Sequence, residues 1–507
     1  MKERPNILLL YTDQERHNGW LPADAAVPVR RQVAGTSMSF DRCYTHTSPC
    51  SPARATLFTG EYVTEHGVSE NVRSPELYLR PEDVTTLGHL LQANGYRTPY
   101  FGKWHLYPGP TPPMEDYGFT DWSGNDMAWW GLPGSGLEYD DVIAGQAARW
   151  LADHGSEAGP WFLTCALVNP HDIMWFPVDQ PWYQERHPEH FAEIRSFNQG
   201  RGDWGRPDNL PVFDRDYPRY TEALPENFAT DLTDRPEVHR RFLQAQAARA
   251  GWLDPGDVDA WLRQLDYYTV LHEMSDRSLG TVLDALAASG QAGDTVVVVT
   301  SDHGDQCGSH GLRSKGPWNY EETLRVPLSI SVPGVTAGGT RTDALCSTVD
   351  LAVTILELGG VEPPEHLPGR SMLPLLTGEA TEIREAVFFA QDWAWYPECM
   401  DSRYASRGFT DGRFKYARYY GVGGSGHTQG GRVGVKRVGP DAPFDDQEHE
   451  LYDLQEDPHE LVNLAADPGR RAQVRRMFDT LLELEAAELV RRVAAPPRPP
   501  ASGARGA

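Results

Sequence analysis

Two strongly apolar β-type runs in this chain are each followed closely by an aspartate. Ile7–Tyr11 precedes Asp13, and Val296–Val299 precedes Asp302. A carboxylate at the end of a buried strand is costly unless it binds something. The carboxyl ends of parallel strands share one crevice, which is where open α/β sheets bind their ligands. The two aspartates therefore predict a parallel sheet with a site for a hard divalent cation at one edge.

The rest of the chain supports a sheet of this kind, because strand-like and helix-like patterns alternate along it. Helical spacing occurs in 51–58, 86–94, 142–153, 261–286 and 349–358, and strand-like runs occur in 7–11, 97–101, 161–168 and 295–300. Such alternation is typical of an α/β fold with a large, mainly parallel sheet flanked by helices.

Changes in this pattern set the expected domain boundaries. We expect a catalytic α/β domain over 1–381, with an irregular Pro-, Asp- and aromatic-rich insertion at about 174–251 that runs over the functional edge of the sheet. A smaller C-terminal α+β domain is expected over 382–494, with short aromatic strands at 386–390 and 413–419 and a final helix at 471–494. The Pro-, Ala- and Gly-rich tail 495–507 is expected to be disordered.

The net charge of −26 makes nucleic acid and anionic membrane surfaces poor partners. The apolar runs are far shorter than the roughly 20 residues that span a bilayer, and the first run lacks a signal-peptide cleavage pattern. Six scattered cysteines do not form a disulfide framework, which indicates a reducing compartment and predicts a cytoplasmic location.

A third element is the segment Cys50-Ser51-Pro52-Ala53-Arg54. Proline is favoured in the first turn of a helix, and the free N–H groups there attract an anion. Cys50 is thus expected to face an anion site. A thiolate is a soft ligand that does not match the hard carboxylates Asp13 and Asp302, so we expect that the sulfur is replaced by another atom.

This segment, followed by Thr59-Gly60, resembles the signature of the type I sulfatases of the alkaline phosphatase superfamily, in which the cysteine is oxidised to formylglycine. The resemblance extends over nearly the whole chain, through the motifs Gly102–His105, Asn169–Asp172, Ser301–Gly304 and Leu324–Pro327. It implies an alkaline-phosphatase-like sheet. It also implies a small anionic ester as the substrate and a transient partner, the formylglycine-generating enzyme that modifies the cysteine.

The resemblance further implies roles for individual residues. One divalent metal ion would be held by the following positions, with Gln14 completing the set: Asp13, Gln14, Asp302, His303 and the oxygen of modified Cys50. Arg54 and Lys103 would hold the formylglycine hydrate, and His105 would assist it. His171 and Lys315 would contact the sulfate or protonate the leaving oxygen.

Two positions depart from the commonest sulfatase pattern. The pairs Asp13-Gln14 and Asp302-His303 stand where many sulfatases have Asp-Asp and Asp-Asn, and they look more like the choline-sulfatase and phosphonate monoester hydrolase branch. One carboxylate fewer and one imidazole more shift the preference from Ca²⁺ toward Mn²⁺. The sequence is compatible with either Ca²⁺ or Mn²⁺ as the bound ion.

The expected reaction is release of inorganic sulfate from an organic sulfate monoester. One hydroxyl of the formylglycine hydrate attacks sulfur, and the other, deprotonated by a group such as His105, expels the sulfate. A phosphonate monoester or phosphodiester hydrolase with the same nucleophile is the alternative, and a non-catalytic anion-binding homologue is a more distant one. A homo-oligomer is also considered, with the loop Gly421–Gly431 as a contact.

Overall fold

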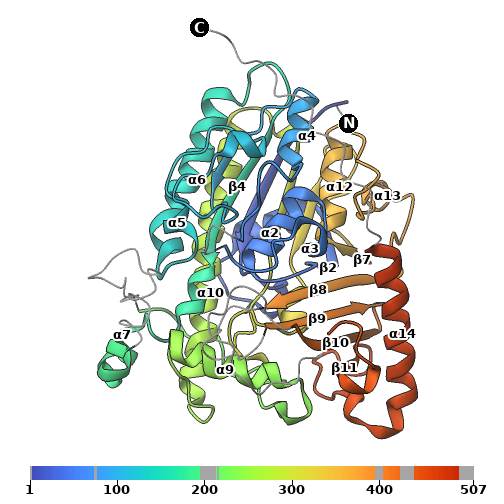
Figure 1. Cartoon of the computed structure of the whole chain (residues 1–507). Helices are drawn as coiled ribbons and strands as arrows, with labels where there is room; N and C mark the ends of the chain where they lie inside the picture. Colours follow the sequence, from blue (N-terminus) through green and yellow to red (C-terminus); the bar gives the residue numbers. More distant parts are fainter. Residues whose placement is uncertain are drawn as a thin grey trace.

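The computed structural model describes residues 3–72, 77–193, 213, 216–393, 403–422 and 439–489. Within them the chain forms a seven-stranded sheet and a four-stranded sheet, drawn one above the other in Figure 1. The predicted disordered tail 495–507 and most of the loop Gly421–Gly431 lie outside the described residues.

The large sheet is mainly parallel, as predicted. Its strands are β1 (Asn6–Asp13), β2 (Met38–Tyr44), β3 (Tyr100–Gly102), β4 (Phe162–Pro170), β5 (Thr295–Ser301), β6 (Leu328–Ser331) and β7 (Thr340–Ser347). Their order is β3-β4-β1-β5-β6-β2-β7, and only β6 runs antiparallel to its neighbours. The sequence-based expectation of an α/β fold with helices on a mainly parallel sheet is confirmed.

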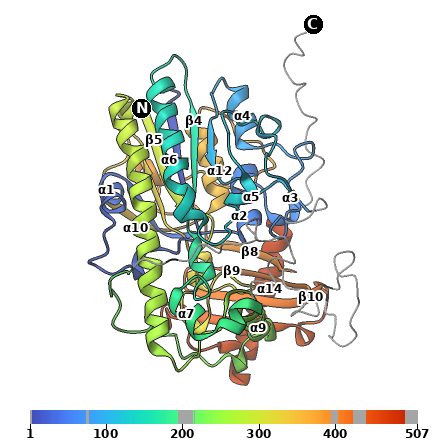
Figure 2. The ribbon, with the colours of Figure 1, turned by 90° about the vertical axis from the view of Figure 1, so that its left-hand side faces the viewer.

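Strand β1 lies at the centre of this sheet and all of its residues are buried. Because side chains alternate across a strand, Leu8 and Leu10 belong to one apolar core and Ile7, Leu9 and Tyr11 to another. The first core includes the helices α6 (Ser135–His154) and α10 (Val258–Ala288), which lie side by side in Figure 2. The second includes α2 (Cys50–Thr59), α4 (Leu87–Ala93) and α12 (Thr348–Leu358).

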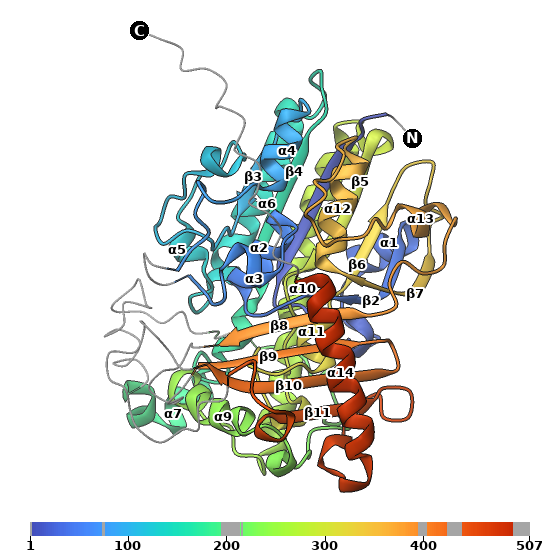
Figure 3. The same ribbon diagram turned by 45° about the vertical axis from the view of Figure 1, so that its right-hand side comes forward.

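The smaller sheet is antiparallel and follows the large one in sequence. Its strands are β8 (Val387–Trp393), β9 (Arg403–Thr410), β10 (Phe414–Val422) and β11 (Glu448–Asp453), in the order β11-β10-β9-β8. Helix α14 (Arg471–Glu488) lies across it (Figure 3) and shares a core of Val474, Phe478 and Leu481 with Phe409 and Tyr416. A C-terminal α+β region is therefore present, while the exact domain limits stay a prediction.

The other helices of the described residues are α1 (Pro28–Thr36), α3 (Val63–His66), α5 (Asp126–Trp129), α7 (Pro181–Arg186), α9 (Glu237–Ala250), α11 (Glu321–Leu324) and α13 (Leu373–Thr377). Two of them, α7 and α9, fall in the stretch expected to be irregular. Half of the residues of helix α9 are polar, so its apolar face is not evident from the sequence. Val238 and Phe242 are buried on that face. The Phe242 ring packs edge-on against Trp318, with ring centroids 4.9 Å apart. Tertiary contact thus stabilises a helix that its own pattern does not indicate.

A buried group of charged side chains connects the two sheets. This group, called the joint below, consists of Glu321, Glu322, Lys415 and Glu460. The ammonium of Lys415, on β10, lies 3.0 Å from Glu321 of α11 and 2.6 Å from Glu460. Lys415 and Glu460 are almost fully buried. Among the helices in the described ranges, none is both long and apolar enough to cross a membrane.

Candidate active site

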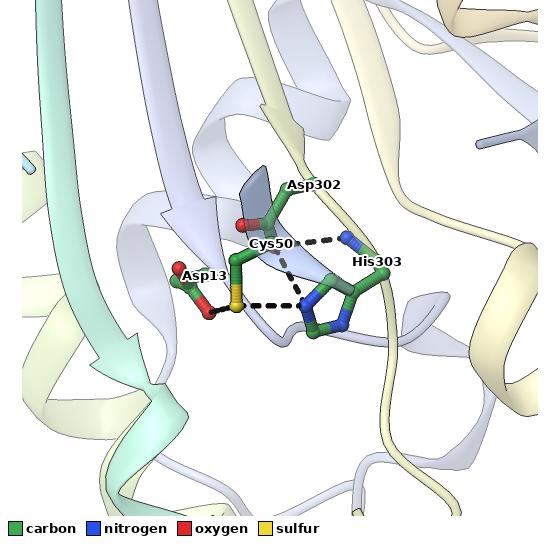
Figure 4. Close-up of side chains that lie close together, drawn as sticks. All are labelled: Asp13, Cys50, Asp302 and His303. Carbon is green, nitrogen blue, oxygen red and sulfur yellow. Dashed lines mark hydrogen bonds and ion pairs between the residues drawn. The ribbon is translucent and has the colours of Figure 1, made fainter. Parts of the chain in front are cut away.

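The two aspartates that follow β1 and β5 lie next to each other, because these strands are neighbours and pair in register up to Thr12 and Ser301. Asp302 accepts the backbone N–H of Gln14 through Oδ1 at 3.0 Å. Both carboxylates are fully buried. The carboxyl ends of the two strands therefore form one polar site, as the sequence predicted, and Figure 4 shows the two side chains there.

Helix α2 brings Cys50 to the same place. The helix begins at Cys50, and its first turn is held by Ser51, whose N–H donates to Asn71 Oδ1 at 3.0 Å and whose hydroxyl donates to the carbonyl of His105 at 2.6 Å. The Cys50 thiol lies 3.5 Å from Asp13 Oδ1 and 3.2 Å from His303 Nε2 (Figure 4). Residues from three distant parts of the chain thus meet around one atom.

These side chains fit a divalent cation in chemistry as well as in position. The ligand atoms of Asp13, Cys50, Asp302 and His303 all lie within 4.8 Å of one another. His303 Nδ1 lies 3.0 Å from the carbonyl of Gly304, which makes Nδ1 the protonated nitrogen and leaves the Nε2 lone pair facing the cluster. Two carboxylates and one imidazole suit Mn²⁺ or Ca²⁺, whereas an unmodified thiol is the poorest match in this set.

Two cations neutralise the carboxylates from the opposite side. Arg54 donates from Nη2 to Asp13 Oδ2 at 2.9 Å and from Nε to Asp302 Oδ2 at 3.1 Å. The ammonium of Lys103 lies 2.7 Å from Asp13 Oδ2. Arg54 also donates to the carbonyl of Lys103 at 2.8 Å, so the two cations hold each other in place.

His171, Lys315 and Gln14 form a third group of contacts. The Lys315 ammonium lies 2.9 Å from His171 Nε2 and donates to the side-chain oxygen of Gln14. The amide of Gln14 donates in turn to Asp305 Oδ2 at 2.5 Å. His171 Nε2 is 4.0 Å from Asp13 Oδ1. All three predicted residues therefore border the cluster around Cys50.

His105 is held by its backbone rather than by its ring. Its N–H donates to Asp126 Oδ2 at 2.9 Å, and its φ of 57° is unusual for a residue with a side chain. Its Nδ1 atom has no hydrogen-bond partner among the described residues. The ring stacks on Trp130 with a centroid distance of 5.2 Å.

Burial and charge shift the pKa values of these groups. Burial alone raises the pKa of Asp13, but the surrounding cations, Lys103 foremost, hold it well below its usual value. Burial and the charge of Asp13 raise the pKa of the Cys50 thiol, and the cations, again led by Lys103, more than offset this and lower it. Burial followed by the charges of Lys315 and Lys103 lowers the pKa of His171. The cluster thus favours anionic ligands and a neutral His171.

Four further residues support the site and were not found from the sequence: Asn71, Asp126, Trp130 and Asp305. Asp305 stands inside the motif that contains Asp302, so its position in the chain was a signal. Asn71 and Asp126 lie in segments with no strand or motif beside them, and their partners are remote in sequence. Trp130 belongs to a tryptophan-rich stretch for which core packing is the simplest explanation. Only the folded chain shows the contacts of Asn71, Asp126 and Trp130.

A mainly parallel sheet with a buried cluster of carboxylates, cations and an N-terminal helix turn at its edge defines an anion-ester hydrolase of the α/β class. The family model described as "Sulfatase" matches residues 5–361, and the model "N-sulphoglucosamine sulphohydrolase, C-terminal" matches residues 308–425. The chain therefore belongs to the sulfatase family, and it is an enzyme of the sulfuric ester hydrolase type.

Individual relatives agree with this assignment. The chain is 30% identical over 391 residues to the uncharacterized sulfatase YidJ of Escherichia coli (strain K12), covering 73% of this chain and 71% of that protein. It is 26% identical to a choline-sulfatase of Rhizobium meliloti (strain 1021), over 92% and 83% of the two chains. A phosphonate monoester hydrolase of Silicibacter pomeroyi has the same fold, with a TM-score of 0.67, 22% identity and 96% of each chain covered. The family and superfamily expected from the motifs are confirmed.

Proposed function

We propose that this enzyme hydrolyses an organic sulfate monoester with a nucleophile made from Cys50 by oxidation to formylglycine, and that it uses one divalent metal ion. The observation that carries the proposal is the position of Cys50. Its side chain lies between Asp13 and His303, at distances that suit a shared cation. A sulfur atom there is a poor ligand, and an oxygen is a good one.

Asp13, Asp302, His303 and the oxygen of modified Cys50 would hold the metal. Gln14 is proposed as a further ligand, and its side-chain oxygen, which accepts from Lys315 here, would turn to the metal. When bound, the metal supplies positive charge that makes a hydroxyl at position 50 more acidic and hence more nucleophilic. Ca²⁺ and Mn²⁺ both suit this donor set.

The remaining residues bind charge and move protons. Arg54, Lys103 and Lys315 bring three positive charges to the neighbourhood of Asp13 and Asp302, so an anionic ester is attracted locally although the whole chain is acidic. The contact between Lys315 and His171 places a charged donor beside a neutral imidazole. This pair is suited to give a proton to the oxygen of the departing alcohol. His105 is placed to accept one, because its Nδ1 atom has no hydrogen-bond partner among the described residues. Burial and then the charge of Lys103 lower the pKa of His105 well below its usual value, so its imidazole is neutral before the proton arrives.

Peptide mass spectrometry tests the modification directly. Cleavage after Arg42 and Arg54 yields a peptide from Cys43 to Arg54 that contains both Cys43 and Cys50. After alkylation of free thiols we expect one alkylated cysteine, at position 43, and an aldehyde at position 50. Two alkylated cysteines in protein co-produced with a formylglycine-generating enzyme would overturn the proposal.

Metal analysis of the same protein tests the second part. We expect about one equivalent of Ca²⁺ or Mn²⁺ per chain, and a lower melting temperature after chelation, because the four ligands are buried. The variant Asp302→Ala should lose the metal. The variant Asp276→Ala removes a buried carboxylate that pairs with Arg30 instead, and it should keep the metal.

Hydrolysis of a phosphonate monoester or phosphodiester by the same residues is the second candidate. The pairs Asp13-Gln14 and Asp302-His303 and the similarity to a phosphonate monoester hydrolase favour it. Initial rates on 4-nitrophenyl sulfate and on a 4-nitrophenyl phosphonate monoester separate the two. A chain with a free thiol at Cys50 and no rate on either ester would instead be a non-catalytic anion-binding homologue.

We also propose a reducing compartment, the cytoplasm, as the place of action. The described cysteines are free and buried, which supports this.

A further inference from the structure

The segment from Asp126 to Gly131 lies among three residues of the proposed catalytic group. It comprises helix α5 and the two residues after it. Asp126 contacts the backbone of His105, Trp130 contacts Lys103, and Gly131 lies against His171. Nothing in the reaction proposed above uses this segment, so its contacts call for a separate explanation.

Asp126 is fully buried, and its carboxylate binds three N–H groups. The backbone N–H groups of Trp104 and His105 donate to it at 2.8 and 2.9 Å. The third donor is the indole Nε1 of Trp130, at 3.0 Å. A carboxylate that accepts successive backbone N–H groups fixes the orientation of the peptide between them.

This matters because the backbone of His105 is in a conformation that residues with a side chain adopt at an energetic cost. Its φ of 57° lies in the left-handed region. Such a conformation persists only where its surroundings hold it, and the bonds to Asp126 do so. They determine the direction in which the His105 ring leaves the chain.

Trp130 extends the effect of Asp126 to the ring of His105 and to Lys103. Its indole N–H binds Asp126, and its ring stacks on the His105 imidazole with an interplanar angle of 29°. Its carbonyl accepts a hydrogen bond from the Lys103 ammonium at 3.1 Å. The carboxylate of Asp126 thus fixes the plane on which the imidazole rests.

Gly131 shows how closely the same segment approaches His171. Its φ is +96°, and a Cβ atom on it would lie 2.1 Å from His171 Cε1. The carbonyl of Gly131 accepts the indole N–H of Trp175 at 2.8 Å. No side chain fits at this position, so the segment packs directly against the second imidazole.

We propose that Asp126 is a positioning residue for the sulfatase reaction, which sets the orientation of His105 directly and that of Lys103 through Trp130. This inference deepens the proposed function and rests on it, because it assumes that His105 and Lys103 act on the reacting group.

The first test is Asp126→Asn in the full-length, metal-loaded enzyme. Asparagine keeps the volume but presents an amide NH₂ to one of the N–H donors, so one of them loses its acceptor. We expect kcat on 4-nitrophenyl sulfate to fall roughly 10- to 100-fold with KM changed less than about 3-fold, since a displaced group of this kind costs about 100-fold. The rates are measured well above pH 6, because burial raises the pKa of Asp126 to about 6.

The matched control is Asp266→Asn. Asp266 is also fully buried and also accepts two successive backbone N–H groups, those of Tyr220 and Thr221, at 2.8 and 2.9 Å. It contacts none of the proposed catalytic residues in the hydrogen bonds and ion pairs of the described ranges. We expect it to lower the melting temperature without changing kcat more than about 3-fold. An equal fall in kcat for both variants would reduce the role of Asp126 to general stability and overturn the inference.

The second test is a double-variant cycle with His105→Ala. If Asp126 acts largely through His105, then Asp126→Asn should cost clearly less in kcat once the imidazole is gone, and no more than the about 3- to 10-fold that the path through Trp130 to Lys103 accounts for. A full, multiplicative loss in the double variant would overturn the inference. If His105→Ala loses activity while Asp126→Asn keeps full activity, the inference about Asp126 is overturned and the proposed function still stands. Full activity in Cys50→Ala would instead overturn the proposed function.

A third variant covers the case in which Asp126→Asn fails to fold. Trp130→Phe keeps an aromatic ring against His105 and removes the indole N–H that binds Asp126, together with one ring of the indole. We expect a fall in kcat of about 3- to 10-fold with KM little changed. A folded Trp130→Phe enzyme with the kcat of the wild type would contradict the path from Asp126 through Trp130 to Lys103.

Discussion

The candidate active site and the joint are both buried groups of charged side chains, and they differ in the sign of the charge that is in excess. In the active site, the cations Arg54, Lys103 and Lys315 surround the carboxylates Asp13 and Asp302. In the joint, the single ammonium of Lys415 faces several carboxylates. The active site can therefore bind an anionic ligand. In the joint, the positive charge of Lys415 is already paired with Glu321 and Glu460, so none is left over for an anion.

Both groups also place metal-ligand types close together, and here the histidines separate them. His303 Nε2 faces Cys50, with Nδ1 bound to a carbonyl. Beside the joint lies His310, and its ligand atom and those of Glu322 and Glu460 in the joint lie within 4.8 Å of one another. However, His310 Nε2 is occupied by the amide of Asn227 at 3.1 Å. Proximity of ligand types thus indicates a metal site only where the lone pairs are free to face it.

The excess of carboxylates in the joint favours the protonated form of Glu460. Burial raises the pKa of Glu460 to about 8, and the charges of Glu321 and Glu322 add to this against the opposing effect of Lys415. We interpret the joint as a structural contact between the sheets, and the predictions below test this contrast.

The largest expected effect is that of Cys50→Ala. Removing the proposed nucleophile should lower kcat/KM by roughly 10⁴-fold or more, measured with 4-nitrophenyl sulfate. The melting temperature should change little, because Asp13, Asp302 and His303 remain to hold the metal. Cys165→Ala is the control: Cys165 is equally buried but lies in an apolar core, so this variant should keep its activity and lose about 1 kcal/mol of stability. Turnover by Cys50→Ala near the wild-type rate would show that the candidate active site, like the joint, is not catalytic.

Cys50→Ser sharpens the same point. A serine hydroxyl can attack the ester, but it has no second hydroxyl with which to expel the sulfate. We expect release of at most about one alcohol per active site, followed by a stop, and an intact mass increased by one sulfonate group. Continued turnover without a mass increase would show that the second hydroxyl is unnecessary.

The next largest effect is that of Lys415→Met on stability. Breaking a buried charge pair by removal of one partner typically costs about 3–5 kcal/mol. We expect a loss of this size in denaturant unfolding, with kcat and KM preserved in the folded enzyme. Arg413→Met is the control, because Arg413 forms an exposed pair with Asp453 that should contribute only about 0–1 kcal/mol. Loss of turnover at unchanged stability in Lys415→Met would mean that the joint belongs to the catalytic machinery.

The smallest predicted effect concerns pH. Between its ordinary pKa of 4.5 and its value of about 8 in the fold, Glu460 keeps a proton that the unfolded chain has already lost. The folded state then binds more protons than the unfolded state, so stability falls as pH rises through this range. Glu460→Gln imitates the protonated form. It should match the wild type near pH 5 and become progressively more stable than the wild type as the pH rises toward 8 and beyond. Parallel stability curves for the two proteins would contradict the raised pKa.

A large part of the fold could be predicted from the sequence. The run Ile7–Tyr11 is apolar on both faces, and this predicted a central parallel strand covered by helices on both sides, as found in β1. Helix α10 was predicted over 261–286 and runs over Val258–Ala288. By contrast, α9 was missed because polar residues make up half of it and most of its apolar residues are alanines, and packing against Trp318 shows which face is buried.

For the site too, some features follow from the sequence and others only from the folded structure. The sequence by itself determined which side chains could do chemistry, because Asp13, Asp302 and Cys50 each stand where strand or helix ends make such residues costly or reactive. What only the tertiary structure decided is how these groups are held: the tautomer of His303, the contact of Lys315 with His171, and the hold of Asp126 on His105. These depend on distances between atoms that are far apart along the chain, and no local pattern records them. The physical reason is that periodicity and motif report the environment of one segment, whereas the orientation of a side chain is set by the partners that folding brings to it.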